Sequence, residues 1–276
     1  MTSDTRLEAL IRIAADAAKV VLEVYQQPFK VDYKGPADPV TDADRRANAL
    51  ICERLAREFP GIPIVAEESA PETFAGYERS SEIFFVDPVD GTNEFIERNA
   101  QFVVMIGLVE GSRATTAVMN APAQGMAWAG AVGKGAFSIA LDGTRAPIHV
   151  SDTREVGQAC LVSSRSHRSA RLDLALEALG VREIVRVGSA GLKGVEVARG
   201  GVDAYVAPHY AGKRWDVCAA EALVASAGGR VTDAYGNDVD YRAPSLSNDR
   251  GVITSNGFVH DALLEKLTAY RASQGN

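Results

Sequence analysis

The order of the apolar segments changes near residue 150, and this change limits the fold more than any other feature of the sequence. Between residues 102 and 140, four short apolar segments are separated only by turns that contain glycine or proline. This spacing predicts the strands of an antiparallel meander. Between residues 160 and 227, strand-like and helical segments alternate, which predicts an α/β arrangement. We therefore expect two halves, residues 1–150 and 151–276, that share a large interface, because no flexible linker separates them.

Two helices and two short strands are expected ahead of the meander. Apolar residues recur at helical spacing from Leu7, and a second periodic segment runs from Asp42 to Glu58. A break in regular structure is expected at residues 35–39, where glycine and two prolines lie close together. The apolar segments Ile62–Ala66 and Ile83–Val86 are short enough to be strands.

The charge balance excludes several classes of partner. The chain has 29 basic and 36 acidic residues and a net charge of −7, which makes a nucleic-acid or anionic-membrane partner a poor match. No apolar run approaches the ~20 residues that a membrane span needs. Acidic residues interrupt the first apolar stretch, and the three cysteines are scattered, so we expect neither a signal peptide nor a disulfide framework. These features predict a cytoplasmic protein.

Acidic residues directly follow both short strands. Glu67 and Glu68 come after the first strand, and Asp87 and Asp90 come after the second. Carboxylates that converge repel one another unless a cation lies between them, and a set of oxygen ligands suits Mg²⁺. The adjacent Gly91-Thr92 could present backbone N–H groups to a phosphate. The pattern indicates phosphoryl transfer, although each acidic pair alone would equally fit a solvated turn.

At this point the sequence resembles the inositol monophosphatase superfamily of Mg²⁺-dependent, lithium-sensitive phosphatases, and it does so over essentially the whole chain. The resemblance implies an α/β (α+β) fold with α/β/α/β/α layers. It rests on groups of residues that occur in the family's order: Thr41-x-x-Asp44, Glu67-Glu68, Asp87-Pro88-Val89-Asp90-Gly91-Thr92, Gly133-x-Gly135-Ala136, Trp215-Asp216-Val217-Cys218-Ala219-Ala220 and Gly228-Gly229.

Within the superfamily the chain is most similar to the 3′(2′),5′-bisphosphate nucleotidases of sulfate assimilation. The similarity implies hydrolysis of the 3′-phosphate of 3′-phosphoadenosine 5′-phosphate to AMP and phosphate. The alternative is a phosphatase that uses the same metals on inositol, histidinol or sugar phosphates. A non-catalytic metal- or phosphate-binding regulator is disfavoured because the expected catalytic residues are all present. The matching segments are Asp90–Ile96, Arg98-Asn99, Ser164-Arg165-Ser166-His167, Val187-Gly188-Ser189 and Lys193, with His209 at a position where inositol phosphatases have glutamate.

The resemblance also implies a role for individual residues, with two or three Mg²⁺ ions bound. Glu67, Asp87 and the Val89 carbonyl would hold one ion, and Asp87, Asp90 and Asp216 would hold another. Thr92 and Asp44 would orient and deprotonate the attacking water, beside Glu67. The substrate, a small phosphorylated nucleotide, would contact Gly91, Thr92, Asn93, His167, Ser189, Lys193, Arg214 and Asp216.

Some of these residues have simpler interpretations. Thr41 with Asp44, and Asp216 at the start of its segment, equally fit helix N-caps. Lys213 and Arg214 could be a solvated pair, although their place just before Trp215-Asp216 also suits contact with a second phosphate. His167 could be an exposed loop histidine. The resemblance is compatible with a monomer or a homodimer.

Overall fold

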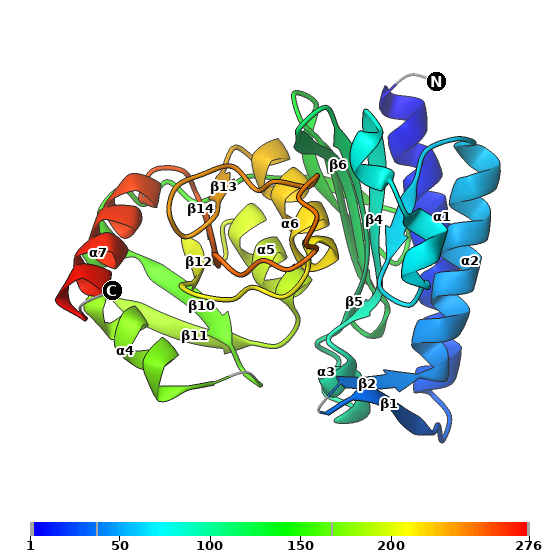
Figure 1. Ribbon diagram of the computed structural model, residues 1–276, viewed down its shortest axis with the longest axis horizontal. Helices are drawn as coiled ribbons and strands as arrows, with labels where there is room; N and C mark the ends of the chain where they lie inside the picture. Colours follow the sequence, from blue (N-terminus) through cyan, green and yellow to red (C-terminus); the bar gives the residue numbers. More distant parts are fainter. Residues whose placement is uncertain (1–2, 37, 167, 275–276) are drawn as a thin grey trace.

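The computed structural model describes residues 3–36, 38–166 and 168–274, and it stacks helices and sheets in five layers (Figure 1). From right to left in Figure 1, the layers are a helix pair, a seven-stranded sheet, a second helix pair, a five-stranded sheet and a third helix pair. This order confirms the α/β/α/β/α fold that the resemblance implied.

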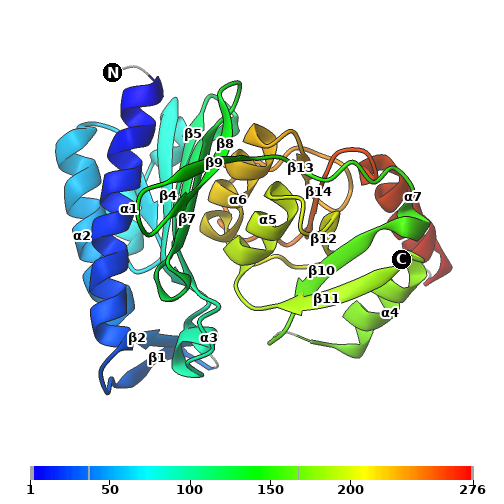
Figure 2. The ribbon, with the colours of Figure 1, turned by 180° about the vertical axis from the view of Figure 1, so that it is seen from behind.

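The seven-stranded sheet follows the order of the chain. Each neighbouring pair from β4 to β9 is antiparallel, and β3 pairs parallel to β4, so the predicted meander is confirmed. One face of the sheet is covered by α1 (Ser3–Tyr25) and α2 (Asp42–Glu58), and Figure 2 shows this pair from behind. The strands are β3 (Ile64–Ala66), β4 (Glu82–Asp90), β5 (Val103–Glu110), β6 (Arg113–Ala121), β7 (Met126–Ala131), β8 (Gly135–Ala140) and β9 (Arg145–Ile148).

The middle layer consists of α5 (Ala190–Ala198) and α6 (Arg214–Ser226), which lie between the two sheets. Small residues allow this close packing. A Cβ atom on Gly107 of β5 would lie 2.6 Å from the Cys218 Sγ atom and 2.8 Å from the backbone nitrogen of Ala219. The backbone of α6 therefore rests almost directly on the seven-stranded sheet, although the helix comes from the other end of the chain.

The five-stranded sheet is mixed, in the order β11-β10-β12-β14-β13. The first three strands run parallel, and β14 pairs antiparallel with both of its neighbours. The outer face packs on α4 and α7 through a cluster that includes Leu161, Leu176 and Leu263. The elements are β10 (Cys160–Ser164), α4 (Ala170–Ala178), β11 (Glu183–Val187), β12 (Ala204–Ala207), β13 (Arg230–Thr232), β14 (Val252–Ser255) and α7 (His260–Ser273).

The structure differs from the sequence-based expectation in the shorter and more polar segments. The break predicted at residues 35–39 instead separates the strands of a small antiparallel sheet, β1 (Val31–Gly35) and β2 (Asp38–Thr41). Strand β4 does not end at Val86 but continues to Asp90, because its pairing with β5 resumes there. Strands β9, β13 and β14 and helix α7 were not predicted. The remaining short elements are α3 (Thr92–Ile96) and the 3₁₀ turns Pro71–Phe74, Tyr77–Arg79, Pro122–Gln124 and Val156–Gln158.

Among the described residues, no helix has both the length and the apolar character that crossing a bilayer requires. The two sheets are formed by residues on either side of position 150. The division into halves at 1–150 and 151–276 stays a prediction. Helix α6 belongs to the second half by sequence but packs on the sheet of the first half.

Replacing Gly107 with alanine should destabilise the protein. The added methyl group must displace Cys218 or the α6 backbone, and overpacking of this kind typically costs about 1–3 kcal/mol. The measurement is urea unfolding of the Gly107→Ala protein. Gly157→Ala is the matched control, since no atom lies within 4 Å of the methyl position there. An unfolding free energy for Gly107→Ala equal to that of the control would show that α6 is not pressed against β5.

Candidate active site

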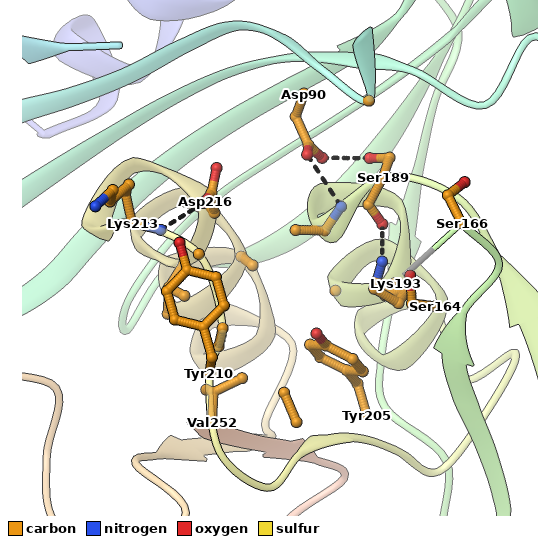
Figure 3. Close-up of a pocket in the computed structure, with 18 of the residues that line it drawn as sticks. Asp90, Ser164, Ser166, Ser189, Lys193, Tyr205, Tyr210, Lys213, Asp216 and Val252 are labelled. Carbon is orange, nitrogen blue, oxygen red and sulfur yellow. Dashed lines mark hydrogen bonds between the residues drawn. The ribbon is translucent and has the colours of Figure 1, made fainter. Parts of the chain in front are cut away.

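Three aspartates from distant parts of the chain converge between the two sheets. One carboxylate oxygen from each of Asp87, Asp90 and Asp216 lies within 4.8 Å of the other two. Figure 3 shows Asp90 and Asp216 reaching toward the same region at the top of a cavity. The expectation that Asp216 meets the aspartates of the first half therefore holds in the geometry of the structure.

An irregularity in β4 brings Asp87 and Asp90 to the same place. Side chains three positions apart in a regular strand point to opposite faces of the sheet. Asp87 pairs with Met105 and Asp90 with Val103, so β4 uses one more residue than β5 over this stretch. An extra residue of this kind is a β-bulge, and it turns the strand locally so that both carboxylates face the same site.

Asp216 is held in the first turn of α6. Its carboxylate accepts the backbone N–H of Lys213, the N-cap residue, at 2.5 Å. Position 212, just before the helix, requires glycine. Gly212 has a φ of 67°, and a Cβ atom there would lie 1.9 Å from the Asp216 Oδ2 atom. The capping interpretation and the metal-ligand interpretation of Asp216 are thus compatible.

Asp90 is held by the N-terminus of α5. Its carboxylate accepts the Ser189 hydroxyl and the backbone N–H groups of Ala190 at 3.1 Å and Gly191 at 2.6 Å. Ser189 has a φ of 59°, unusual for a residue that carries a side chain. Gly191 leaves room for this contact, since a Cβ atom would lie 2.4 Å from the Met105 Sδ atom. A residue of the first half therefore anchors a helix of the second.

Burial and mutual repulsion make the ionised cluster unfavourable without a cation. Burial, together with the charges of Glu67, Asp90 and Asp216, raises the pKa of Asp87 well above its usual value. Burial and the charges of Glu67 and Asp90 raise the pKa of Asp216 to about 8. Carboxylate oxygens are the ligands that hard divalent cations prefer, and such an ion would relieve the repulsion. The residues therefore fit a divalent metal.

Glu67 lies beside the cluster and is paired with a lysine that the sequence analysis missed. The Lys34 Nζ atom of the β1–β2 hairpin lies 3.0 Å from the Glu67 Oε1 atom and 2.6 Å from the Glu68 Oε1 atom. Burial raises the pKa of Glu67 to about 7, although Lys34 opposes the rise. No local pattern distinguishes Lys34 from other exposed lysines, because its contact depends on the fold bringing the hairpin to β3.

The half-buried Thr92 pairs with the buried Asp44 next to the aspartates. The Thr92 hydroxyl lies 3.1 Å from the Asp44 Oδ1 atom and 3.2 Å from the Val89 carbonyl oxygen, and either oxygen can accept a hydrogen bond from it. The other oxygen of Asp44 accepts the Thr41 N–H at 2.8 Å and the Thr41 hydroxyl at 2.6 Å. Thr41 is also the N-cap of α2, so the residues predicted as a helix cap form one and contact Thr92 as well.

A cavity of about 1050 Å³ opens in front of the cluster. Asp44, Asp87 and Val89 lie behind its surface, and Arg214 is not part of it. The predicted site residues that line it are Glu67, Asp90, Gly91, Thr92, Asn93, Ser189, Lys193 and Asp216. Other lining residues include Lys213, which the sequence analysis considered for a second phosphate, and Lys34, Arg168, Tyr205 and Tyr210, which it did not predict.

Two predicted substrate contacts are not supported by the structure. Arg214 lines a separate, smaller cavity and donates to the Asn248 side chain, so its placement gives no support to a contact with a second phosphate. His167 lies outside the described residues. Lys193, by contrast, is buried beside the large cavity, where its Nζ atom donates to the Ser189 carbonyl at 2.6 Å and lies 5.3 Å from the centre of the Tyr205 ring (Figure 3).

Comparison with known proteins agrees with this geometry. The sequence pattern of the inositol monophosphatase family matches residues 3–274. The chain belongs to this family. A curated relative, the 3′(2′),5′-bisphosphate nucleotidase CysQ of Escherichia coli O6:H1, is 35% identical over 240 residues, which are 85% of this chain and 93% of the relative. The resemblance identified from the sequence is therefore confirmed, and so is the prediction of a phosphatase related to the bisphosphate nucleotidases.

Solved structures of the family share the fold. CysQ from Bacteroides thetaiotaomicron, described as a bacterial member of the inositol monophosphatase family, superposes with a TM-score of 0.76 at 26% identity, over 92% of this chain and 97% of that one. The inositol monophosphatase from Anabaena superposes with a TM-score of 0.78 at 28% identity, over 96% of each chain. Both kinds of phosphatase therefore have this fold, and the fold alone does not select a substrate.

The metal-free protein should lose stability as the pH rises, and Asp216→Asn should reduce that loss. An acid whose pKa is raised in the folded state favours folding below its ordinary pKa, about 4 for aspartate, and this contribution is lost as the pH rises toward the folded-state value. For Asp216 that value is about 8. In chelator at pH 8, we expect Asp216→Asn to be more stable than the unmutated protein by about 1 kcal/mol in urea unfolding, with a smaller difference at pH 5.

The exposed Asp152→Asn change is the control and should leave the pH dependence unaltered. Added Mg²⁺ should stabilise the unmutated protein more than the Asp216→Asn protein. Lower stability of the variant at pH 8 in chelator would contradict the repulsion that the geometry implies.

Proposed function

We propose that this protein hydrolyses the 3′-phosphate of 3′-phosphoadenosine 5′-phosphate to give AMP and phosphate, in a Mg²⁺-dependent reaction. The observation that carries the proposal is the combination of the half-buried Thr92, hydrogen-bonded to the buried Asp44, with three converging aspartates at the wall of a cavity. The curated relatives named bisphosphate nucleotidases, at 34–35% identity over most of the chain, support the choice of substrate.

The residues that would hold Mg²⁺ are Asp87, Asp90 and Asp216, with Glu67 and the Val89 carbonyl at the edge of the cluster. Magnesium, when bound, supplies Lewis acidity, which makes water a better nucleophile and withdraws charge from the phosphate. The Asp90 side chain keeps its contact with α5, so the same carboxylate orients that helix and faces the site.

Thr92 and Asp44 would activate the attacking water. When the Thr92 hydroxyl donates to Asp44, its lone pairs remain available to accept a hydrogen bond from water. Burial raises the pKa of Asp44, which makes the carboxylate a stronger base for a proton that passes through Thr92. The water oxygen then bonds to phosphorus, the bond to the 3′-oxygen breaks, and that oxygen takes up a proton.

The cavity gives the second reason to favour a nucleotide. Its volume of about 1050 Å³ exceeds what one phosphate group needs and is at the upper end for small-molecule sites, which span about 300–1,000 Å³. Lys193 offers a buried cation for a second phosphate, and Tyr205 and Tyr210 provide aromatic surface for a base. A cytoplasmic location and a monomeric or homodimeric state remain part of the proposal.

A phosphate-release assay tests the substrate. The purified protein is incubated with Mg²⁺ and, separately, 3′-phosphoadenosine 5′-phosphate, inositol 1-phosphate, fructose 1,6-bisphosphate and histidinol phosphate. We expect the nucleotide to have the highest kcat/KM, and chelation of Mg²⁺ to abolish release. A higher value for inositol 1-phosphate would reject the nucleotide in favour of the alternative. Release from none of the four would favour a binding protein over an enzyme.

Replacing Thr92 with alanine should lower kcat by roughly 10²–10⁴-fold, the usual contribution of a positioned proton-transfer group. The change removes the hydroxyl and leaves the aspartates in place, so KM and metal binding should change little. Thr73→Ala is the matched control, because within the described part of the chain the Thr73 hydroxyl bonds only to the Ala70 carbonyl, in an exposed turn. A kcat within a factor of two of the unmutated value would exclude Thr92 from the reaction.

A further inference from the structure

Another buried carboxylate, Glu94, lies near the aspartate cluster and has no place in the mechanism above. Glu94 is the third residue of α3, and only 2% of it is exposed. One of its oxygens accepts the Ser166 hydroxyl. The other accepts the Asn99 side-chain amide and the Arg165 Nε atom at 3.1 Å, and an Arg165 terminal nitrogen lies 2.8 Å away. Glu94 therefore receives hydrogen bonds from residues on two distant segments.

Those contacts tie the catalytic helix to a wall of the cavity. Helix α3 begins with Thr92, the proposed water-activating residue. Ser166 belongs to a group of cavity-lining residues at and beyond the end of β10, and we call this group the β10 wall. The β10 wall consists of Ser163, Ser164, Ser166, Arg168 and Ser169.

The space that Glu94 occupies depends on a glycine of the second half. A Cβ atom on Gly188 would lie 2.4 Å from the Glu94 Cδ atom and 2.7 Å from its Oε1 atom. The Gly188 N–H donates to the Gln101 side chain at 2.6 Å, which adds another bond between the same two segments. The Val187-Gly188-Ser189 motif was noted in the sequence but is not used in the mechanism. The closeness of Glu94 explains why its middle residue is glycine.

The neighbouring Glu97 provides a comparison within the same helix end. Its carboxylate also contacts Arg165, but its side chain is 56% exposed. An ion pair in solvent contributes little to stability, whereas a buried carboxylate depends on the donors that surround it. Burial alone would raise the pKa of Glu94, but the bonds from Ser166, Asn99 and Arg165 hold it below its usual value.

We propose that Glu94 is a positioning residue that fixes the β10 wall relative to Thr92, and that it thereby determines how tightly the enzyme binds the part of the substrate beyond the scissile phosphate. The inference rests on the proposed function, since it concerns the same cavity. A substrate that reaches only the phosphate-binding end of the cavity gains nothing from the wall. A nucleoside bisphosphate extends further and gains from it.

The test compares Glu94→Gln with Glu97→Gln on two substrates, with Mg²⁺ present. The first substrate is 3′-phosphoadenosine 5′-phosphate, and the second is p-nitrophenyl phosphate, which carries a single phosphate on a small ring. Glutamine keeps the size of the side chain but removes the charge that Arg165 contacts. We expect Glu94→Gln to raise KM for the nucleotide by about tenfold or more, with kcat and the p-nitrophenyl phosphate parameters within a factor of two. Glu97→Gln should leave both substrates unchanged.

Gly188→Ala provides a second route to the same effect. The added methyl group pushes the Glu94 carboxylate from its place without removing the charge, so KM for the nucleotide should rise as it does in Glu94→Gln. Thermal unfolding of both variants verifies that they are folded. Because the two changes act on opposite sides of one contact, the double variant should raise KM by less than the product of the two single effects.

The outcomes separate the possible failures. A parallel loss of activity on both substrates would place Glu94 at the reaction centre or in the fold and overturn the positioning role, as would unchanged KM values in both variants. An unmutated protein that releases phosphate from p-nitrophenyl phosphate but not from the bisphosphate would overturn the proposed function, and this inference with it.

Discussion

Repulsion between Asp87, Asp90 and Asp216 is the constraint on which the arrangement of the two halves depends. Their oxygens lie within 4.8 Å of one another in a buried region, so packing must hold together groups that electrostatics would separate. Two close approaches supply that packing: the contact of α6 with Gly107 and the contact of α5 with Met105. The N-terminal ends of both helices also face the carboxylates, and the partial positive charge at a helix N-terminus lowers the cost of gathering them.

Several carboxylates of the site have two roles, because each also accepts hydrogen bonds at the N-terminus of a helix. Asp44 completes the cap of α2 and accepts a hydrogen bond from Thr92. Asp90 holds the first turn of α5, and Asp216 accepts the N–H of the residue that precedes α6. A carboxylate that already satisfies backbone N–H groups has few conformations open to it. The carboxylates that we propose as metal ligands are thus largely preorganised, which would reduce the entropic cost of binding an ion.

The sequence predicted the fold where the signal is local. The helix predicted from Asp42 to Glu58 is α2, and the alternation of strands and helices predicted between residues 160 and 227 is present, because apolar periodicity and turn residues mark these elements. Strand β1 of the β1–β2 hairpin is mostly exposed, and the two strands depend on pairing with each other, so no apolar pattern in the sequence predicts the hairpin. Strands β13 and β14, with three and four residues, are too short to show a period.

The sequence predicted the acidic residues of the candidate site, but of the cations that line the cavity it singled out Lys193 and missed Lys34 and Arg168. Asp87 and Asp216 lie within short sequence motifs that can be recognised from their neighbours. Lys34, by contrast, contacts Glu67, 33 positions away, only because of the tertiary fold. The neighbours Lys213 and Arg214 illustrate the same limit. They differ by one residue at the start of α6, and that step directs Lys213 to the large cavity and Arg214 to the smaller one.

The extra residue in β4 implies that the spacing between Asp87 and Asp90 is a matter of chain length more than of residue type. Pro88 and Val89 form the bulged part of the backbone, and other residues that adopt the same backbone conformation would preserve the placement of the two carboxylates. Deleting one residue would leave the two aspartates two positions apart in a regular strand, where both side chains face the same side but lie about 6.5 Å apart along the strand instead of being turned toward one point. Variation among proteins with this site should therefore accumulate as substitutions within the Asp-x-x-Asp segment and never as insertions or deletions.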